Sequence, residues 1–537
     1  MKVQTIVQRV KQFDIFDRMM IVLCLFHGIA NTIWINLNTA PLPWDQAGHT
    51  VVALKFYEYI NGTSQESIAQ ISQQYAPFVH FTTALVMSLV GPNPLVGSYV
   101  TTAFFIACLV FLYLYIVELT HDKTLAFMSS LLFSLLPPVY AASRWLLLDI
   151  PLTALFLSSL FFLEKSNGLT HKKYSILFTV FLSATLLAKE QAIVYFIIPL
   201  MFKAKQLLRA NKKTLLAFGA AVLLVVSPWY LVNASAISQF VQFFYTGEPG
   251  DPQQVLSAES IFYYLYILIN FSFTLFGFLF LLFALYWTRY VKLTARLLLT
   301  VLFTYVVFTF VHNKDSRYIL PILPFLAVIV AYPFATFIKQ RLFFPAFLFP
   351  LLISYYLLYF FMLSFGFPLD PTVVNYQRAI KVPVVGWIDY VNLGKDTSFY
   401  LAPRYNQEAW PNDTIVEDVY ASLEQRRPHV LVVVDKRHLN TGNLQLAANL
   451  AGYGHIHFES PYSTDRFEDY PALERYVAYF SMALVVDQSF GPADAIRHAE
   501  ALTQLKEYMQ SRSDVSQPLR EYQLPDGDTV TLYNITM

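Results

Sequence analysis

The sequence predicts a polytopic α-helical membrane protein with a C-terminal α/β domain. Of its 537 residues, 56% are hydrophobic and only 14% are charged, whereas a soluble domain carries about 25% charged residues. The composition also changes along the chain: Leu, Phe, Val, Ile and Tyr dominate up to about residue 365, and the remainder is ordinary and polar. We therefore expect a transmembrane domain over residues 1–365 and a second domain over residues 366–537.

Apolar runs predict about eleven transmembrane helices, because a spanning helix needs about 20 mainly apolar residues. The two short runs on either side of "AKE" (188–190) form either a tight helical hairpin or one bent element. A further run, 77–90, is too short to cross and predicts an interfacial helix that lies on the membrane. The eleven runs cover residues 19–38, 96–118, 124–142, 149–163, 174–188, 190–202, 214–232, 259–287, 295–311, 318–337 and 342–365.

The distribution of Lys and Arg predicts a multi-pass protein of the cell (plasma or inner) membrane with a cytoplasmic N-terminus, because these residues concentrate in cytoplasmic loops. With an odd number of crossings, the C-terminal domain is then extracytoplasmic. A cleaved signal peptide is disfavoured, since the charged leader extends to Arg18 and no small-residue cleavage site follows the apolar run. One set of loops holds 18 Lys and Arg residues, and the other set holds five: Lys55, Arg144, Lys189, Lys314 and Arg317.

Several classes of function are disfavoured by the sequence. The formal net charge of +1 argues against nucleic acid as a partner, which would need a basic face. Cys24 and Cys108 lie inside apolar runs and are interpreted as packing residues rather than a disulfide or metal pair. There is no Walker pattern and no G-x-G-x-x-G fingerprint, so no nucleotide-binding loop is expected.

Two carboxylates of the outer loops are candidate catalytic residues, because charges close to membrane ends are costly and tend to be functional. Asp45, in "PLPWDQAGH", precedes an expected amphipathic surface helix over residues 46–60. It is either the N-cap of that helix, or a functional carboxylate that acts as a general base or orients an attacking hydroxyl. A cap and a base are not exclusive. Asp149 precedes a spanning helix and Pro151. It is either an N-cap or a second carboxylate for a metal ion or an acceptor hydroxyl.

The cations of the outer face are candidate phosphate ligands. Lys314 and Arg317 lie beside Tyr318, and Arg offers a bidentate fork where Lys offers a point charge. The alternative is a pair of side chains that extend to the membrane interface without a ligand. Lys189 and Arg144 are included as phosphate candidates, although Lys189 alternatively pairs with its neighbour Glu190.

The sequence does not establish a metal cofactor. His49 lies one helical turn after Asp45, so Asp45, His49 and Asp149 are the candidate ligands of a divalent ion. A metal site needs several converging ligands, and a lone exposed histidine is more often without a special role.

The order and spacing of these motifs resemble membrane glycosyltransferases of the GT-C type, in particular the group of protein O-mannosyltransferases and bacterial aminoarabinose transferases. The resemblance covers about residues 15–340. It implies a GT-C-like fold, a polyprenyl-phosphate-linked sugar donor, an acceptor on the outer face that is a protein, lipid or glycan, and inversion at the anomeric carbon. The matching pieces are "WDQAGHTVVAL", "YAPFVHFTTALVMSLVG", "RWLLLDIPLTALFL", "LLAKEQAIV", "SPWYLVN" and "KDSRYILPILPFLAVIVA".

The resemblance also implies roles for particular residues. Asp45 matches the first-loop aspartate that acts as base, Asp149 matches the second-loop acidic residue, and residues 314–318 match the stretch near the lipid phosphate. There are departures from the family pattern. Gln46 stands where a glutamate usually follows the aspartate, and Ala76 replaces the first member of a proline pair. The first departure weakens any metal or proton-sharing role for the pair.

Two other functions are weighed against this one. A polytopic transporter or lipid flippase would show internal repeats and charges in mid-helix, but no convincing repeat is present and runs 96–118 and 214–232 lack central charges. A structural subunit of an envelope complex is disfavoured by the number of charged outer motifs.

The region after residue 366 alternates strand and helix signals. We expect strands over 396–402 and 429–435, the second of them buried because it is almost wholly apolar. Helices are expected over 414–427 and 493–510, and a hairpin around Asp-Gly over 520–535. This pattern predicts a small α/β domain with a Rossmann-like core.

Overall fold

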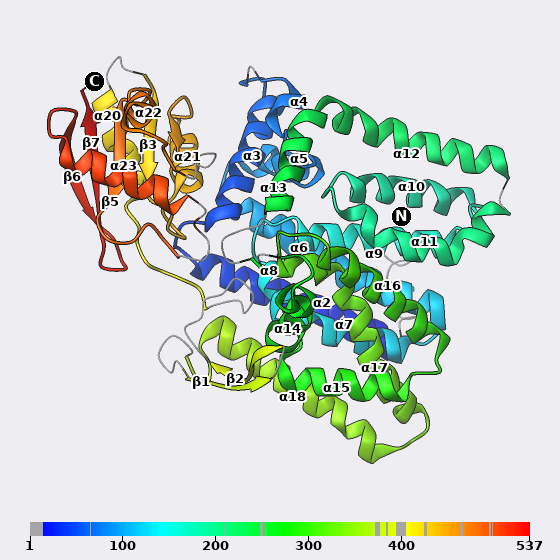
Figure 1. Ribbon diagram of the computed structural model, residues 1–537. Helices are drawn as coiled ribbons and strands as arrows, with labels where there is room; N and C mark the ends of the chain where they lie inside the picture. The colour runs from blue at the N-terminus through cyan, green and yellow to red at the C-terminus, as the bar shows by residue number, and fades with distance from the viewer. Residues whose placement is uncertain are drawn as a thin grey trace.

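The computed structural model combines a large helical part, up to Phe365, with a smaller C-terminal part that contains the main sheet (Figure 1). This confirms the expected fold class. The structure describes residues 14–64, 66–209, 211–246, 251–252, 254–370, 376–382, 385–393, 404–423, 427–461, 466–492, 496 and 498–536.

The helical part consists of α-helices, one π-helix (η1) and one 3₁₀-helix (η2). In chain order they are α2 (Ile15–Leu37), α3 (Trp44–Ile60), α4 (Ile68–Ile71), α5 (Phe78–Val90), α6 (Val96–Thr120), α7 (Lys123–Ser134), α8 (Pro137–Ala142), α9 (Asp149–Lys165), α10 (Lys172–Leu186), α11 (Ala192–Leu208), α12 (Lys212–Val232), α13 (Ala234–Thr246), α14 (Ala258–Ile267), η1 (Leu268–Ser272), α15 (Thr274–Trp287), α16 (Lys292–Thr309), η2 (Ser316–Ile322), α17 (Leu323–Lys339) and α18 (Phe343–Phe365).

Among the described residues, six helical segments are long and apolar enough to cross a membrane: α2, α6, α12, α16, α18, and η2 with α17. A seventh candidate is the pair Ala258–Ser272 and Thr274–Trp287. The chain is therefore a multi-pass membrane protein. Helices also form at the other expected crossings, but α7, α9, α10 and α11 have only 12 to 17 residues, so the number eleven stays a prediction.

The expected crossing over residues 259–287 is bent by 114° between its two halves, so whether it crosses as one span stays a prediction. The π-helix η1 lies directly before the break, and Thr274 directly after it has a left-handed φ of 55°. A π-turn interrupts the regular hydrogen-bond ladder of an α-helix, so the two halves cannot continue one axis. The runs around "AKE" are two separate helices, α10 and α11, as the hairpin alternative predicts.

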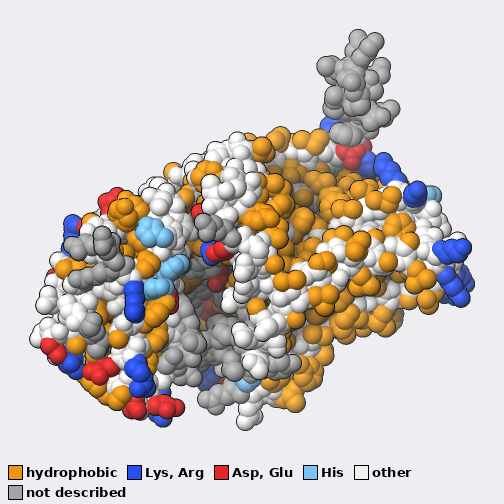
Figure 2. All heavy atoms as spheres, turned by 90° about the horizontal axis from the view of Figure 1, so that it is seen from above, with side chains coloured by type: hydrophobic (Ala, Val, Ile, Leu, Met, Phe, Trp, Pro, Cys, Tyr) orange, Lys and Arg blue, Asp and Glu red, His pale blue; other side chains and the backbone are white. Residues whose placement is uncertain are grey.

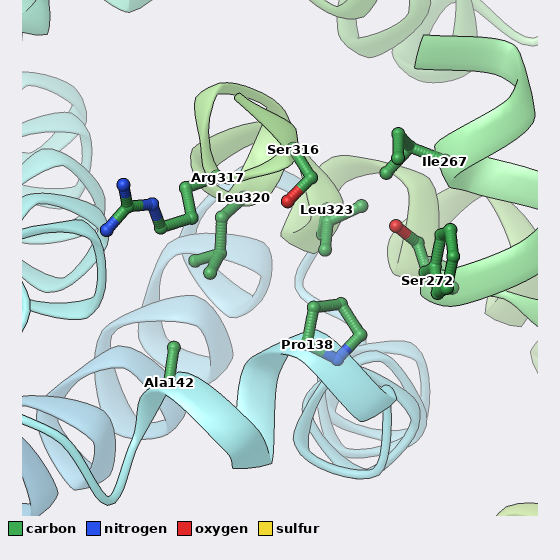
Figure 3. Close-up of a pocket in the computed structure, with 9 residues that line it drawn as sticks. Pro138, Ala142, Ile267, Ser272, Ser316, Arg317, Leu320 and Leu323 are labelled. Carbon is green, nitrogen blue, oxygen red and sulfur yellow. The ribbon is translucent and has the colours of Figure 1, made fainter. Parts of the chain in front are cut away.

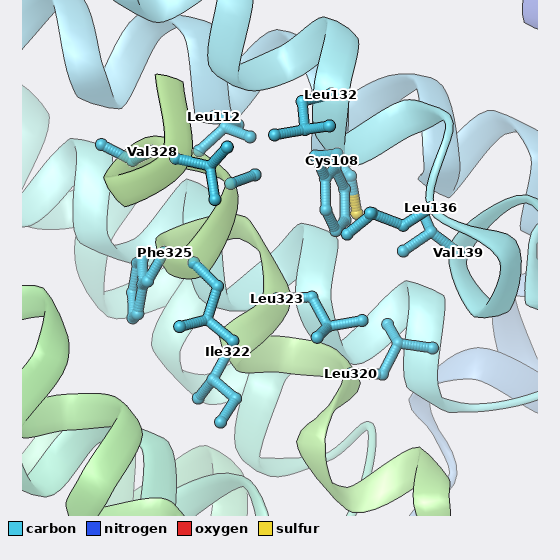
Figure 4. Packing of buried hydrophobic residues seen from close by; sticks show 14 of the residues in the cluster. Cys108, Leu112, Leu132, Leu136, Val139, Leu320, Ile322, Leu323, Phe325 and Val328 are labelled. Atoms are coloured by element: carbon cyan, nitrogen blue, oxygen red, sulfur yellow. The ribbon is translucent and has the colours of Figure 1, made fainter. Parts of the chain in front are cut away.

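The core of the helical part is built around α17, which is buried along almost its whole length. Side chains of α6, α7 and α8 interdigitate with those of η2 and α17 (Figure 4). Cys108 is fully buried in this cluster and Cys24 packs against it, and both are free thiols. Their interpretation as packing residues is confirmed.

Helix α3 packs between α5 and helix α21 (Thr441–Leu450) of the C-terminal part (Figure 1). Its buried residues therefore include the polar side chains of Gln46, His49 and Thr50 besides apolar ones such as Phe56. This corrects the expectation of an amphipathic helix that lies along the surface, because α5 and α21 both cover α3. The 13-residue α5 is a short apolar helix, as the run 77–90 predicts.

The C-terminal part is an α/β domain around a five-stranded sheet of order β4-β3-β5-β7-β6. β3 is parallel to β4 and β5, and β7 is antiparallel to β5 and β6. Apolar clusters cover both faces of the sheet. The elements are β3 (His429–Val433), β4 (His457–Glu459), β5 (Met482–Val486), β6 (Ser516–Gln523), β7 (Thr529–Ile535), α20 (Asn412–Leu423), α21, α22 (Tyr470–Val477) and α23 (Ala499–Ser511).

The expected elements of this domain correspond closely to observed ones. The strand over 429–435 is β3, the helices over 414–427 and 493–510 are α20 and α23, and the hairpin is β6–β7. The expected strand over 396–402 lies outside the described residues. A separate hairpin, β1 (Tyr376–Val382) with β2 (Gly386–Leu393), follows α18, and the domain boundary at residue 366 stays a prediction.

Gly277 in α15 leaves the space that the side chain of Tyr356 in α18 occupies. A Cβ atom at this position would overlap the hydroxyl of Tyr356, which is buried and donates a hydrogen bond to the Phe273 carbonyl. We expect Gly277→Ala to lower the free energy of unfolding by about 1–3 kcal/mol, the usual cost of overpacking. Thermal unfolding in detergent measures this change.

The matched control is Gly219→Ala in α12, where no atom lies within 4 Å of the added carbon. It is expected to be neutral or slightly stabilising, because Ala has the higher helix propensity. Equal melting temperatures for the Gly277→Ala variant and the unchanged protein would contradict the account.

Candidate functional site

A cluster of charged side chains forms where four segments meet: the start of α3, the start of α9, the turn between α10 and α11, and η2. Arg317 Nη1 lies 2.8 Å from Asp45 Oδ2, and Lys189 Nζ lies 2.7 Å from Asp149 Oδ1. The Lys189 ammonium also lies 5.5 Å from the ring centroid of Tyr318. The structure therefore brings together five of the residues that the sequence singles out. Figure 2 shows acidic side chains in the hollow between the C-terminal domain and the helical part.

Asp45 lies in the first turn of α3, where a negative charge interacts favourably with the helix dipole. Pro43 occupies the N-cap position, so the N-cap interpretation of Asp45 is wrong. The carboxylate is 47% exposed and accepts a hydrogen bond from Arg317. Burial raises the pKa of Asp45, but the charge and hydrogen bond of Arg317, together with the more distant Lys189 ammonium, outweigh this effect and hold the pKa below its usual value. Asp45 is thus ionised at neutral pH.

Arg317 is held between two carboxylates. Its Nε and Nη2 atoms each lie 2.6 Å from Asp315 Oδ2, and its Nη1 atom reaches Asp45. Asp315 also caps η2 by accepting from the backbone N–H of Arg317 at 2.8 Å. Asp315 was not among the predicted site residues, although its position two residues before Arg317 could have indicated this contact. The guanidinium extends away from the small cleft that Ser272, Ser316 and apolar side chains line beside it (Figure 3).

Asp149 and Lys189 form a buried ion pair, with side chains 2% and 14% exposed. Leu148 is the N-cap of α9 and Asp149 is its first residue, so the N-cap interpretation is wrong here too. Lys189 does not pair with Glu190 as the alternative predicted. Glu190 instead accepts a hydrogen bond from the backbone N–H of Ala76 at 2.8 Å and so fixes the start of α5.

Tyr318 contributes its ring rather than its hydroxyl to the cluster. The hydroxyl is buried and donates to Asn313 Oδ1 at 2.9 Å, and the Tyr318 carbonyl accepts from the hydroxyl of Tyr195 at 2.8 Å. These bonds hold the ring against the ammonium of Lys189, a cation–π arrangement.

Lys314 and Arg144, the other two candidate phosphate ligands, contact carbonyl groups and aromatic rings instead of the charged cluster. The Lys314 ammonium donates to the carbonyls of Phe308, Thr309 and Val311 at 2.6–3.0 Å and so caps the end of α16. Its burial lowers the pKa of Lys314 to about 8. Arg144 is fully buried; its Nε donates to Asn31 Oδ1 at 3.1 Å, and its guanidinium lies 5.2–5.9 Å from the ring centroids of Trp34, Tyr140, Phe360 and Phe365.

The candidate metal ligands do not fit a metal ion. Asp45 is paired with Arg317, Asp149 with Lys189, and His49 Nδ1 lies 3.0 Å from Nε2 of His80. Burial lowers the pKa of His49 to about 4 and also lowers that of His80, so the two rings are neutral and one donates to the other. Within the described part of the chain, no three His, Cys, Asp or Glu residues converge. His80 was not predicted, because a single histidine in an apolar helix carries no distinctive signal.

The apolar helices, the short helix α3 with an aspartate in its first turn, and the C-terminal α/β domain together form a GT-C-like fold. Two crystal structures of ArnT from Cupriavidus metallidurans share this fold. The apo structure has a TM-score of 0.54 at 13% identity and covers 95% of this chain and 97% of that chain. The structure bound to undecaprenyl phosphate has a TM-score of 0.54 at 12% identity, with 96% and 97% covered. The resemblance seen in the sequence is confirmed at the level of the fold.

A more distant likeness links part of the chain to the S. cerevisiae protein O-mannosyltransferase Pmt1-Pmt2 complex bound to the sugar donor. It has a TM-score of 0.32 at 15% identity, covers 44% of this chain and 34% of that chain, and is too slight to inform the fold. No protein-family model matches the chain. No curated protein sequence matches it significantly.

The buried pair of Lys189 and Asp149 yields a stability prediction. Lys189→Met leaves the Asp149 carboxylate buried without its cation, and we expect this to lower the free energy of unfolding by about 3–5 kcal/mol. The double variant Lys189→Met/Asp149→Leu should recover most of the loss, since apolar replacement of both partners is often neutral or stabilising. Unfolding in detergent, analysed as a double-mutant cycle, measures the coupling.

Lys55→Met is the control, because it breaks an exposed pair with Glu66 whose side chains are 39% and 45% exposed. Its expected cost is below about 1 kcal/mol. Similar costs for Lys189→Met and Lys55→Met would show that the buried pair is not formed.

Proposed function

We propose that the protein is a glycosyltransferase that moves a sugar from a polyprenyl-phosphate-linked donor to an acceptor hydroxyl, with inversion and with Asp45 as the base. The contact between Asp45 and Arg317, which joins a base candidate to a phosphate-ligand candidate across the chain, carries this proposal. The shared fold with ArnT, one structure of which is bound to undecaprenyl phosphate, supports it.

The proposed reaction needs two opposite charges in one place. The acceptor hydroxyl has a pKa near that of water, so a base must take its proton as the new bond forms. The proton passes to Asp45, the hydroxyl oxygen bonds to the anomeric carbon, and the bond from that carbon to the phosphate oxygen breaks. The phosphate leaves with the bonding electrons and needs cations beside it. Attack opposite the leaving group inverts the anomeric centre.

Arg317 and Lys189 are the proposed ligands of the donor phosphate. The guanidinium offers a planar fork that matches phosphate geometry, and Asp149 and the ring of Tyr318 orient the Lys189 ammonium. Lys314 acts indirectly, because its bonds to carbonyl groups fix the chain between α16 and η2. Arg144 also acts indirectly, because it holds together the helices whose aromatic rings surround it. A donor phosphate would compete with Asp45 for Arg317. Its binding would therefore release the carboxylate and make it a stronger base.

The proposed site faces the extracytoplasmic side of the plasma or inner membrane. The bias of Lys and Arg between alternate loops supports this orientation. In Figure 2, basic side chains gather at the end of the molecule remote from the C-terminal domain. With the N-terminus in the cytoplasm, the C-terminal domain and the acceptor lie outside. The acceptor is a protein, lipid or glycan hydroxyl.

Asp45→Asn tests the proposed base. The variant keeps the size of the side chain but accepts no proton, so turnover with polyprenyl-phosphate-linked hexose or pentose donors should fall about 10²–10⁴-fold. Asp413→Asn, which changes a first-turn aspartate of α20, is the control and should leave turnover unchanged. Unchanged turnover in the Asp45→Asn variant would remove Asp45 from the chemistry.

Arg317→Gln tests the proposed phosphate ligand separately from the base. We expect the dissociation constant for undecaprenyl phosphate to rise about tenfold or more, because a charge-assisted hydrogen bond is lost. Calorimetry in detergent measures this constant without turnover. Arg289→Gln, at an exposed arginine of the chain between α15 and α16, serves as the control. Equal affinities of the two variants would place the phosphate elsewhere.

A further inference from the structure

The C-terminal domain holds the segment that leads into α3. The backbone N–H groups of Thr39 and Ala40 donate to the Asn406 carbonyl at 2.9 and 3.0 Å, and the N–H of Asn406 donates to Asn38 Oδ1 at 2.8 Å. His438 Nδ1 bonds to the Pro41 carbonyl at 2.7 Å. Asn443 donates to the Leu42 carbonyl. Almost every residue of segment 38–44 is therefore bonded to the domain.

The first turn of α3 is held most directly through Trp44. Its indole Nε1 donates to Asp435 Oδ1 at 3.2 Å, and its backbone N–H donates to the Arg437 carbonyl at 3.2 Å. The first N–H groups of a helix have no partner within the helix, and Pro43 at the N-cap provides no side-chain cap. The C-terminal domain thus supplies bonds that the helix start lacks.

The backbones of the two parts also approach closely. A Cβ atom at Gly442, in the first turn of α21, would lie only 3.5 Å from the backbone nitrogen of Gly48 and 3.7 Å from the Cβ of Ala47. Helix α21 packs against α3 (Figure 1), and Gly442 contacts Ala47 and Gly48, which follow Asp45 by two and three positions. A shift of the domain would therefore move the helix that carries the carboxylate.

The bonds to Trp44 come from a particular edge of the sheet. Asp435 and Arg437 follow β3, at the carboxyl end of the parallel strands, and the N–H of Asp435 donates to the Phe490 carbonyl after β5 at 2.7 Å. In open α/β sheets this edge is where ligands bind. Here the edge holds a segment of the same chain.

We propose that Asp435 is a positioning residue, which sets the orientation of α3 through the indole of Trp44 and so holds Asp45 against Arg317. The proposal rests on the proposed function for its effect on turnover, and on the contacts alone for its effect on α3. Trp44 directly precedes Asp45, so the rotation of α3 that satisfies the indole bond also fixes the direction of the carboxylate.

The test compares three variants of the full-length protein in detergent. Asp435→Leu removes the acceptor, Asp435→Asn keeps an oxygen that accepts the indole N–H, and Asp418→Asn is the matched control. Asp418 belongs to the same domain, where it pairs with Arg520 at 2.8 Å. Two readouts are used: kcat and KM for sugar transfer, and hydrogen exchange of the backbone amides of residues 44–50.

In Asp435→Leu we expect kcat to fall about tenfold, the effect of one lost hydrogen bond. The KM for the donor should stay within about twofold, because Arg317 and Lys189 are unchanged. Amides 44–50 should exchange about tenfold faster. Asp435→Asn and Asp418→Asn should behave like the unchanged protein in both readouts. A general folding defect would instead change kcat and KM together and speed exchange throughout the domain.

The proposal would be overturned if amides 44–50 of Asp435→Leu exchanged as slowly as those of the unchanged protein. It would also be overturned if Asp435→Asn lost as much kcat as Asp435→Leu. If Asp435→Leu does not fold, Trp44→Phe removes the donor instead of the acceptor and is held to the same two readouts. If the unchanged protein transfers no sugar, the proposed function is refuted. The positioning role still stands in that case if amides 44–50 exchange faster in Asp435→Leu alone.

Discussion

The ion pair between Asp45 and Arg317 is the contact on which the organisation of the site depends. It joins residues 272 positions apart, so it exists only if the first loop and the segment before α17 are both held in place. Asp315 holds the arginine from its own segment, and the C-terminal domain holds the helix that carries the aspartate. A buried second pair, Lys189 with Asp149, lies beside them. The pair places a carboxylate and a guanidinium at the same point, as the proposed transfer from a phosphate-linked donor requires.

The helices could be predicted from the sequence because their apolar runs are long. Features that depend on how helices pack against one another could not be predicted from the sequence. No Pro or Gly occurs in residues 268–274, so the sequence carries no signal for the bend there. The partner of Lys189 depends on how α9 packs against α10, and it is Asp149 rather than the adjacent Glu190. Asp45 and Arg317 were identified from their position near membrane ends. Lys314 and Arg144 satisfy the same criterion, yet their neighbours turned out to be carbonyl groups and aromatic rings.

The C-terminal domain has its predicted α/β character but an unpredicted use. An apolar strand such as β3 is visible in the sequence, whereas the contact of its carboxyl edge with segment 38–44 joins residues almost 400 positions apart, such as Trp44 and Asp435. Neither hydrophobic periodicity nor a sequence motif predicts a contact between residues so far apart in the chain. Helix α3 therefore lies between α21 of the C-terminal domain and α5 of the helical part, and it links the two parts.

The most direct measurement is an experimental structure of the protein with a polyprenyl phosphate bound. The account predicts a phosphate oxygen within about 3 Å of the Arg317 guanidinium, with the carboxylate of Asp45 facing the space that the sugar would occupy. A phosphate bound on the other side of the membrane helices, or one whose ligands are Lys314 and Arg144 while Asp45 and Arg317 stay paired, would contradict it.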